Sequence, residues 1–209
     1  MIRAALATIV LCWSVLPSPG TAAGLTPVQT AALSARLYEA GEQAGDPLLM
    51  LAAAKLRKAI APVPGDRAPE GAAAEVDTPL TWQEMLAGAE AAAAGDEVMA
   101  GLIADLRVET SKGAISGPVY NIASLGSGGT DVYPPIDFRG GDYAEVYVEA
   151  KTTTDLNLTI LDAKGRLVCS DSDISHIAYC GWRPAETGGF TIRVENRGPS
   201  GGRYALMTN

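Results

Sequence analysis

The chain has 209 residues, of which 47% are hydrophobic and 6% aromatic, and its formal net charge is −8 at neutral pH. This length accommodates one or two small domains, and the hydrophobic fraction excludes a wholly disordered chain. The negative charge argues against a nucleic-acid partner, because phosphate binding needs a clustered basic surface, and the single histidine excludes multi-histidine metal sites within one chain.

Residues 1–23 have the layout of a secretory signal peptide. Arg3 precedes an apolar run over residues 4–16, and helix-breaking residues and small residues at 21–23 follow it. The run is too short to span a bilayer well; a buried N-terminal helix is the alternative interpretation. We expect cleavage before Gly24 and a periplasmic or secreted bacterial protein with no membrane span.

Residues 24–112 are predicted to form a small antiparallel α-helical bundle. Four helix starts carry capping signals, each followed by apolar residues at helical spacing. The starts are Thr26-Pro27, Asp46-Pro47, the capping box of Thr81 and Glu84, and Asp96. The tripeptide Ala-Gly-Asp precedes the second and the fourth helix. This weak repeat indicates either two related helical hairpins or coincidence among alanine-rich helices.

Residues 61–79 separate the two predicted hairpins. The segment holds four prolines and several acidic residues, and its apolar residues recur with neither a helical nor a strand period. This composition predicts a flexible linker.

Residues 113–209 change to the alternating pattern that is typical of β-strands. Apolar residues alternate with tyrosine and glutamate over 143–150, and similar alternation recurs at 156–160 and 190–195. Glycine-rich turns separate these runs, which indicates an antiparallel, jelly-roll-like β-sandwich. The chain is therefore predicted to be of the α+β class, and we expect the sandwich to fold alone.

Two cysteines, Cys169 and Cys180, lie within the predicted sandwich. In an exported chain an even pair of cysteines predicts a disulfide. Two reduced, buried thiols are the alternative.

Several segments of the predicted sandwich resemble, in their order and spacing, the bacterial pre-peptidase C-terminal (PPC-like) domain family. They are FRGGD at 138–142, AEVYV at 144–148, TDLNLTILDAKG at 154–165, GGFTIRV at 188–194 and GRYAL at 202–206. Asn157 stands where the family usually has a second aspartate, and this sequence carries no peptidase domain. The resemblance implies a sandwich fold, export and an accessory binding role, and it does not imply proteolysis.

No catalytic constellation is visible in the sequence. His176 is the only histidine, and its neighbour Ser175 points to the opposite face of a strand, so the two side chains cannot pair. Nucleophile-elbow, zinc-ligand and phosphate-loop motifs are absent. We predict that the protein is not an enzyme and that His176 is either hydrogen-bonded or exposed to solvent.

Two groups of side chains are candidates for binding. Four aspartates offer oxygen ligands for Ca²⁺, although such residues are also common in exposed turns; apart from this ion we expect no cofactor. They are Asp155, Asp162, Asp171 and Asp173. Three aromatic residues would form a platform for sugars or peptides, although aromatic residues also favour strands for packing alone. They are Tyr143, Tyr147 and Trp182.

The preferred functional hypothesis is an exported, non-enzymatic accessory protein with a ligand- or partner-binding β-sandwich. Its partner would be a protein or a carbohydrate, in the cell envelope or outside the cell. One alternative is an envelope structural or assembly factor that docks partners through the helical half. Another is an accessory subunit of a hydrolase.

Overall fold

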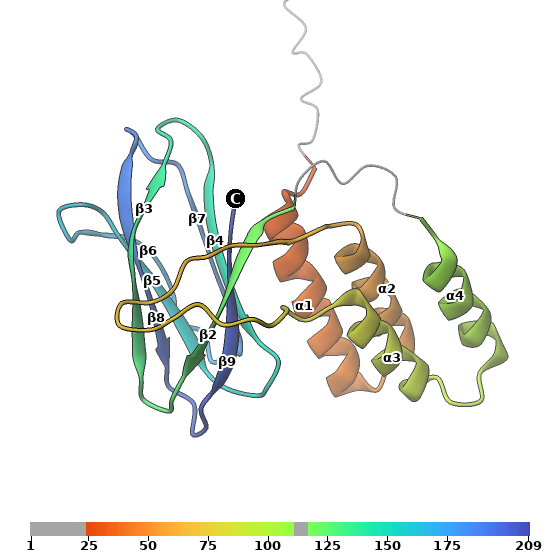
Figure 1. The fold of residues 1–209 in the computed structure, drawn as a ribbon. Coiled ribbons are helices and arrows are strands. Elements are labelled where there is room, and N and C mark those ends of the chain that lie inside the picture. Colours follow the sequence, from red (N-terminus) through yellow and green to blue (C-terminus); the bar gives the residue numbers. More distant parts are fainter. Residues whose placement is uncertain (1–23, 111–116) are drawn as a thin grey trace, which may run out of the picture.

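The computed structural model describes residues 24–110 and 117–209 (Figure 1). The described residues form four α-helices and a β-sandwich whose first short strand lies between the second and third helices, which confirms the α+β class. The expected signal peptide and the expected boundary near Gly113 lie outside these residues. No helix within the described ranges is both long and apolar enough to cross a membrane.

The helices begin at the residues that the capping signals predict. They are α1 (Pro27–Ala44), α2 (Pro47–Lys58), α3 (Trp82–Ala92) and α4 (Glu97–Val108). Thr26 and Thr81 each form a capping box with the residue three positions later, and Asp46 and Asp96 each accept hydrogen bonds from two backbone amides of the following turn. Gly45 ends α1 in the left-handed conformation, with φ of 62°, which glycine adopts without a steric penalty.

Two sheets form the sandwich. The first, called sheet A here, has the strand order β1-β2-β9-β4-β7, and sheet B has the order β3-β8-β5-β6. The strands are β1 (Val63–Pro64), β2 (Val119–Leu125), β3 (Thr130–Phe138), β4 (Ala144–Ala150), β5 (Leu156–Leu161), β6 (Leu167–Asp171), β7 (Ile177–Trp182), β8 (Gly188–Asn196) and β9 (Gly202–Thr208). All pairings are antiparallel except that of β1 with β2. The inward-facing apolar residues of both sheets make one core.

The segment expected to be a flexible linker is instead hydrogen-bonded along the sandwich. It contributes β1 to sheet A, and Figure 1 shows it crossing the strands and returning toward α3. The backbone amide of Arg67 donates to Asn121 Oδ1 at 2.7 Å, that of Glu70 donates to the carbonyl of Val132 at 2.8 Å, and that of Glu75 donates to the carbonyl of Ile122 at 3.3 Å. Because backbone hydrogen bonds hold this segment in place, its apolar side chains do not have to recur at a helical or strand spacing. The sequence pattern therefore gives no signal of these hydrogen bonds.

Helix α1 covers the outer face of sheet A. Small and apolar residues on one side of the helix pack on apolar residues of β2, β4, β7 and β9 in a second core. The helix contributes Val28, Ala31, Ala32 and Ala35, and the sheet contributes Ile122, Tyr147, Ile177, Ala205 and Met207. Three of the four helix residues are alanine, which lets the helix approach the strands closely. The helical half and the sandwich therefore share an interface that excludes water.

Candidate functional site

The expected aromatic platform of Tyr143, Tyr147 and Trp182 does not form. Tyr147 is completely buried beneath α1. Trp182 lies on the opposite face of sheet A, where its ring packs against Phe138 and Phe190 with centroid distances of 4.9 and 5.3 Å. Only Tyr143 is exposed. The platform does not form because α1 covers the face of β4 that carries Tyr147, and because Trp182, which pairs with Ala144, points into the core between the two sheets.

The four candidate calcium ligands are not brought together. Asp162 pairs with Arg166 in the β5–β6 turn at 2.6 Å, and Asp155 lies at the start of β5, where its carbonyl accepts a hydrogen bond from Arg197. Within the described ranges, no group of three or more His, Cys, Asp or Glu side chains is placed to hold a metal ion.

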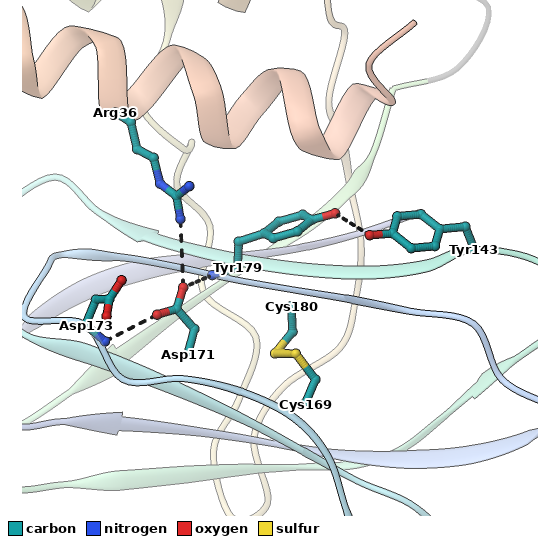
Figure 2. The surroundings of a disulfide bond; sticks show 7 residues. All are labelled: Arg36, Tyr143, Cys169, Asp171, Asp173, Tyr179 and Cys180. Atoms are coloured by element: carbon teal, nitrogen blue, oxygen red, sulfur yellow. Dashed lines mark hydrogen bonds and ion pairs between the residues drawn. A yellow bond between two sulfur atoms is a disulfide. The ribbon is translucent and has the colours of Figure 1, made fainter. Parts of the chain in front are cut away.

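Asp171 and Asp173 are close to each other and serve a structural role (Figure 2). Asp171 accepts hydrogen bonds from the backbone amides of Asp173 at 3.3 Å and Tyr179 at 2.9 Å, and Arg36 of α1 approaches it at 3.8 Å. Asp171 thus ties the end of β6 to β7 and to α1.

The predicted disulfide between Cys169 and Cys180 is present, with an S–S distance of 2.15 Å and a Cα–Cα distance of 5.9 Å. Figure 2 shows it beside Asp171. It joins β6, at the edge of sheet B, to β7, at the edge of sheet A. The disulfide therefore links the two layers of the sandwich directly.

His176 lies just before β7 and is partly buried. Its Nδ1 atom is 3.7 Å from Glu39 Oε1 of α1, so a protonated His176 would form an ion pair with that carboxylate. The histidine therefore contributes to the contact between α1 and the sandwich.

A cleft of about 460 Å³ lies where the helices meet the edge of sheet A. We call it the junction cleft. Both halves contribute to it, with Trp82 from α3 and Tyr120 from β2 as its aromatic residues, each half-buried. Its lining is Arg57, Lys58, Ile60, Ala61, Pro62, Thr78, Pro79, Leu80, Thr81, Trp82, Gln83 and Tyr120.

Arg57 forms one wall of the junction cleft and is held by a buried ion pair. Its two terminal nitrogens donate to Glu149 at 2.9 and 2.7 Å. Burial alone would lower the pKa of Arg57, but the charge of Glu149 and its hydrogen bonds raise it, so the guanidinium stays charged. Glu149 also accepts from the hydroxyl of Tyr147 at 2.6 Å and from the backbone amide of Leu80 at 3.0 Å. This network fixes α2, β4 and the segment before α3 relative to one another.

The second cation of the junction cleft is also engaged. Lys58 Nζ lies 4.2 Å from the centre of the Trp82 ring and donates to the carbonyls of Leu106 and Arg107 at the end of α4. By contrast, no hydrogen bond among the described residues involves the side chains of Thr78, Gln83 or Tyr120. The cleft therefore offers aromatic surface and neutral polar groups, while its charges are satisfied within the protein.

Sequence reasoning found only part of this site. The strand alternation placed Glu145, Tyr147 and Glu149 on one face, and that face was expected to meet solvent. Nothing in the pattern marks Arg57 as the partner of Glu149. Trp82 stands out in the sequence as the one tryptophan of residues 24–112, whereas Tyr120 carries no comparable signal.

No protein family model and no curated protein matches the sequence. Solved structures similar to part of the chain include the Yersinia pseudotuberculosis-derived mitogen, which is 12% identical with a TM-score of 0.36 over 44% of this chain and 85% of that one. The pre-peptidase C-terminal domain of collagenase from Bacillus anthracis is 14% identical with a TM-score of 0.33, over 42% of this chain and 87% of that one.

Another such structure is PliG of Aeromonas hydrophila, a periplasmic inhibitor of g-type lysozyme. It is 11% identical with a TM-score of 0.33, over 48% of this chain and 93% of that one. These likenesses concern the fold alone and carry no information about ligand or partner. The resemblance to the PPC-like family accordingly extends to the sandwich fold and no further.

Proposed function

We propose that the protein is an exported, non-enzymatic accessory protein that binds a neutral carbohydrate of the cell envelope or its surroundings in the junction cleft. The observation that carries the proposal is the chemistry of the cleft: half-buried Trp82 and Tyr120 beside uncommitted neutral polar groups. Export rests on the signal-peptide layout of residues 1–23, and the disulfide is compatible with an oxidising compartment.

The lining of the junction cleft suits a sugar ring. Apolar and aromatic walls with a few placed polar groups are typical of small-molecule sites, and about 300–1,000 Å³ is their usual volume. Trp82 and Tyr120 supply flat apolar surface, and the side chains of Thr78 and Gln83 supply neutral donors and acceptors. An acidic ligand would find no free cation, because Arg57 and Lys58 already have partners.

The rigidity of the cleft supports binding rather than catalysis. Arg57, Glu149 and Leu80 lock the two sides of the cleft together, so a ligand meets a preformed surface and little ordering free energy is lost on binding. Among the lining residues, the hydroxyl of Thr81 donates to the carboxylate of Glu84 at 2.7 Å, and this contact belongs to the capping box that begins α3.

The test is titration of the purified chain with a panel of oligosaccharides, followed by calorimetry and by tryptophan fluorescence. The panel contains neutral glucose, xylose and N-acetylglucosamine oligomers, with uronic-acid oligomers as the acidic counterpart. We expect a neutral oligomer to bind, and Trp82→Ala to weaken its binding about tenfold or more. Tyr143→Phe lies outside the cleft and serves as the matched control. Equal affinities for the wild-type chain and Trp82→Ala would contradict the site.

A second candidate function is docking of a partner protein through the helical half. A groove of about 500 Å³ runs between α2 and α4, with Leu48, Leu51 and Leu102 along it. Leu48 is 56% exposed and Leu102 is 42% exposed, an arrangement that suits the apolar face of a partner helix. If Leu48→Glu abolished recovery of a defined envelope partner while Trp82→Ala did not, this function would replace the first.

A further inference from the structure

Glu145, in β4, is a completely buried carboxylate that is only half satisfied. Its Oε1 atom accepts hydrogen bonds from the hydroxyls of Thr26 and Tyr179, each at 2.7 Å. Its Oε2 atom is buried and has no hydrogen-bond partner in the structure. Buried polar atoms almost always have partners, so an unpartnered carboxylate oxygen calls for an explanation.

Glu149, four residues further along the same face of β4, has the cationic partner that Glu145 lacks. Both of its oxygens meet the guanidinium of Arg57, and a hydroxyl and a backbone amide complete its shell. Glu145 has no ion pair with any cation in the described part of the chain. Its charged or titratable neighbours are Tyr179, which hydrogen-bonds it, and Tyr143, whose hydroxyl is 3.4 Å from that of Tyr179 (Figure 2).

The residue that contacts Glu145 from the helical side is Thr26, the N-cap of α1. Thr26 lies two residues after Gly24, the residue at which the mature chain is expected to begin. Because each residue spans at most about 3.6 Å, the backbone nitrogen of Gly24 stays within about 8 Å of Thr26. Gly24 and Leu25 are exposed, and a side chain added at Gly24 would meet no other atom within 4 Å, so neighbouring atoms leave this short segment room to turn toward Glu145.

We infer that the α-amino group created at Gly24 by removal of the signal peptide is the missing cation, and that it forms a buried ion pair with Glu145. Hydrolysis of the Ala23–Gly24 peptide bond consumes one water, leaves a carboxylate on Ala23, and leaves on Gly24 an amine that is protonated at neutral pH. The uncleaved chain has an uncharged amide nitrogen at the same place. Processing would thereby complete the charge balance of the α1–sandwich interface.

This inference rests on the export clause of the proposed function and is independent of the carbohydrate site. The ion pair would hold α1 more strongly against sheet A in the processed chain than in the unprocessed chain. The ion pair also fits the buried position, since a buried charge is tolerated when a hydrogen-bonded counter-charge meets it.

The first experiment compares three forms of the chain from residue 24 to residue 209. One begins at Gly24 with a free amine, one has that amine acetylated, and one carries a single serine before Gly24. We expect the free-amine form to melt at least about 3 °C higher than the other two at pH 7. The glutamine variant Glu145→Gln should abolish that difference, whereas Glu186→Gln, at an exposed loop residue, should preserve it.

The second measurement is the chemical reactivity of the Gly24 α-amine. The rate at which an acylating reagent labels the α-amine of Gly24 should rise severalfold in Glu145→Gln and stay unchanged in Glu186→Gln. Equal melting temperatures for the three forms, or equal labelling rates in the wild-type chain and Glu145→Gln, would overturn the ion pair.

N-terminal sequencing of the exported protein separates the two proposals. A mature start other than Gly24 would overturn this inference and leave the carbohydrate site standing. Failure of every oligosaccharide to bind would overturn the carbohydrate site and leave the ion pair standing.

Discussion

Arg57 of α2 and Glu149 of β4, 92 residues apart in the sequence, form a two-pronged ion pair in which each side chain is only 2% exposed. Ser34 and the carbonyl of Ala31 complete the shell of the arginine. This pair joins α2 to β4, and its partners from α1 bring a second helix into the same contact. The helical half therefore behaves as a fixed part of the molecule, and the junction cleft next to it has a defined shape.

Removing one partner of this pair should destabilise the protein strongly. In Glu149→Ala a buried guanidinium loses its counter-charge, and such losses cost about 3–5 kcal/mol. Urea unfolding followed by circular dichroism measures the change. Arg107→Ala is the matched control, since it breaks the exposed pair with Glu90 and should cost about 0–1 kcal/mol. Similar costs for the two variants would show that the buried pair is not needed for stability.

Loss of the disulfide should loosen the two sheets. Cys169→Ser removes a cross-link between β6 and β7, and by chain entropy a closed loop of this size contributes about 2–3 kcal/mol. We expect a lower melting temperature and faster proteolysis within residues 170–175. Free-thiol titration of denatured protein that was purified without reductant should detect neither Cys169 nor Cys180, and two reactive thiols would contradict the bond.

The sandwich should not be stable without the helices. Strand alternation in the sequence predicts that residues 113–209 fold alone, whereas the structure places Glu149 against Arg57 and Tyr147 beneath α1. Without the helices, a charged and apolar face of sheet A would be left without its partners. We expect the isolated segment to show no cooperative thermal transition, in contrast to the chain from residue 24. A sharp transition in the isolated segment would show that the sandwich folds alone.

Alkaline pH should destabilise the fold through its buried tyrosines. Burial raises the pKa of Tyr133, Tyr147 and Tyr204, and it raises the pKa of Tyr38 to about 12 with help from Glu42. Above about pH 10 the unfolded chain loses phenolic protons that the folded chain retains, so stability is present below that pH and is lost as pH rises. Urea midpoints measured between pH 8 and 11.5 should fall above pH 10, and less steeply in Tyr204→Phe.

The local features of this protein follow from its sequence. Thr26, Asp46, Thr81 and Asp96 begin helices because a side-chain oxygen and the following amides are neighbours along the chain. The alternation in β4, β5 and β8 forms strands for an equally local reason, since successive side chains of an extended chain point to opposite faces. The pairing of Cys169 with Cys180 could be predicted because they are the two cysteines left once the expected signal peptide, which contains Cys12, is set aside.

The tertiary structure alone decided that neither face of β4 meets water. Alternation shows that Glu145, Tyr147 and Glu149 share a face, but burial of that face depends on α1, α2 and Arg57, which come from far away in the chain. The course of residues 61–79 was equally hidden, because backbone hydrogen bonds to β2 and β3 leave no trace in side-chain periodicity. Both features arise from contacts between segments that are distant in the sequence. Glu149 can be buried only because Arg57, from another element, neutralises its charge, and residues 61–79 are ordered by backbone hydrogen bonds to distant strands.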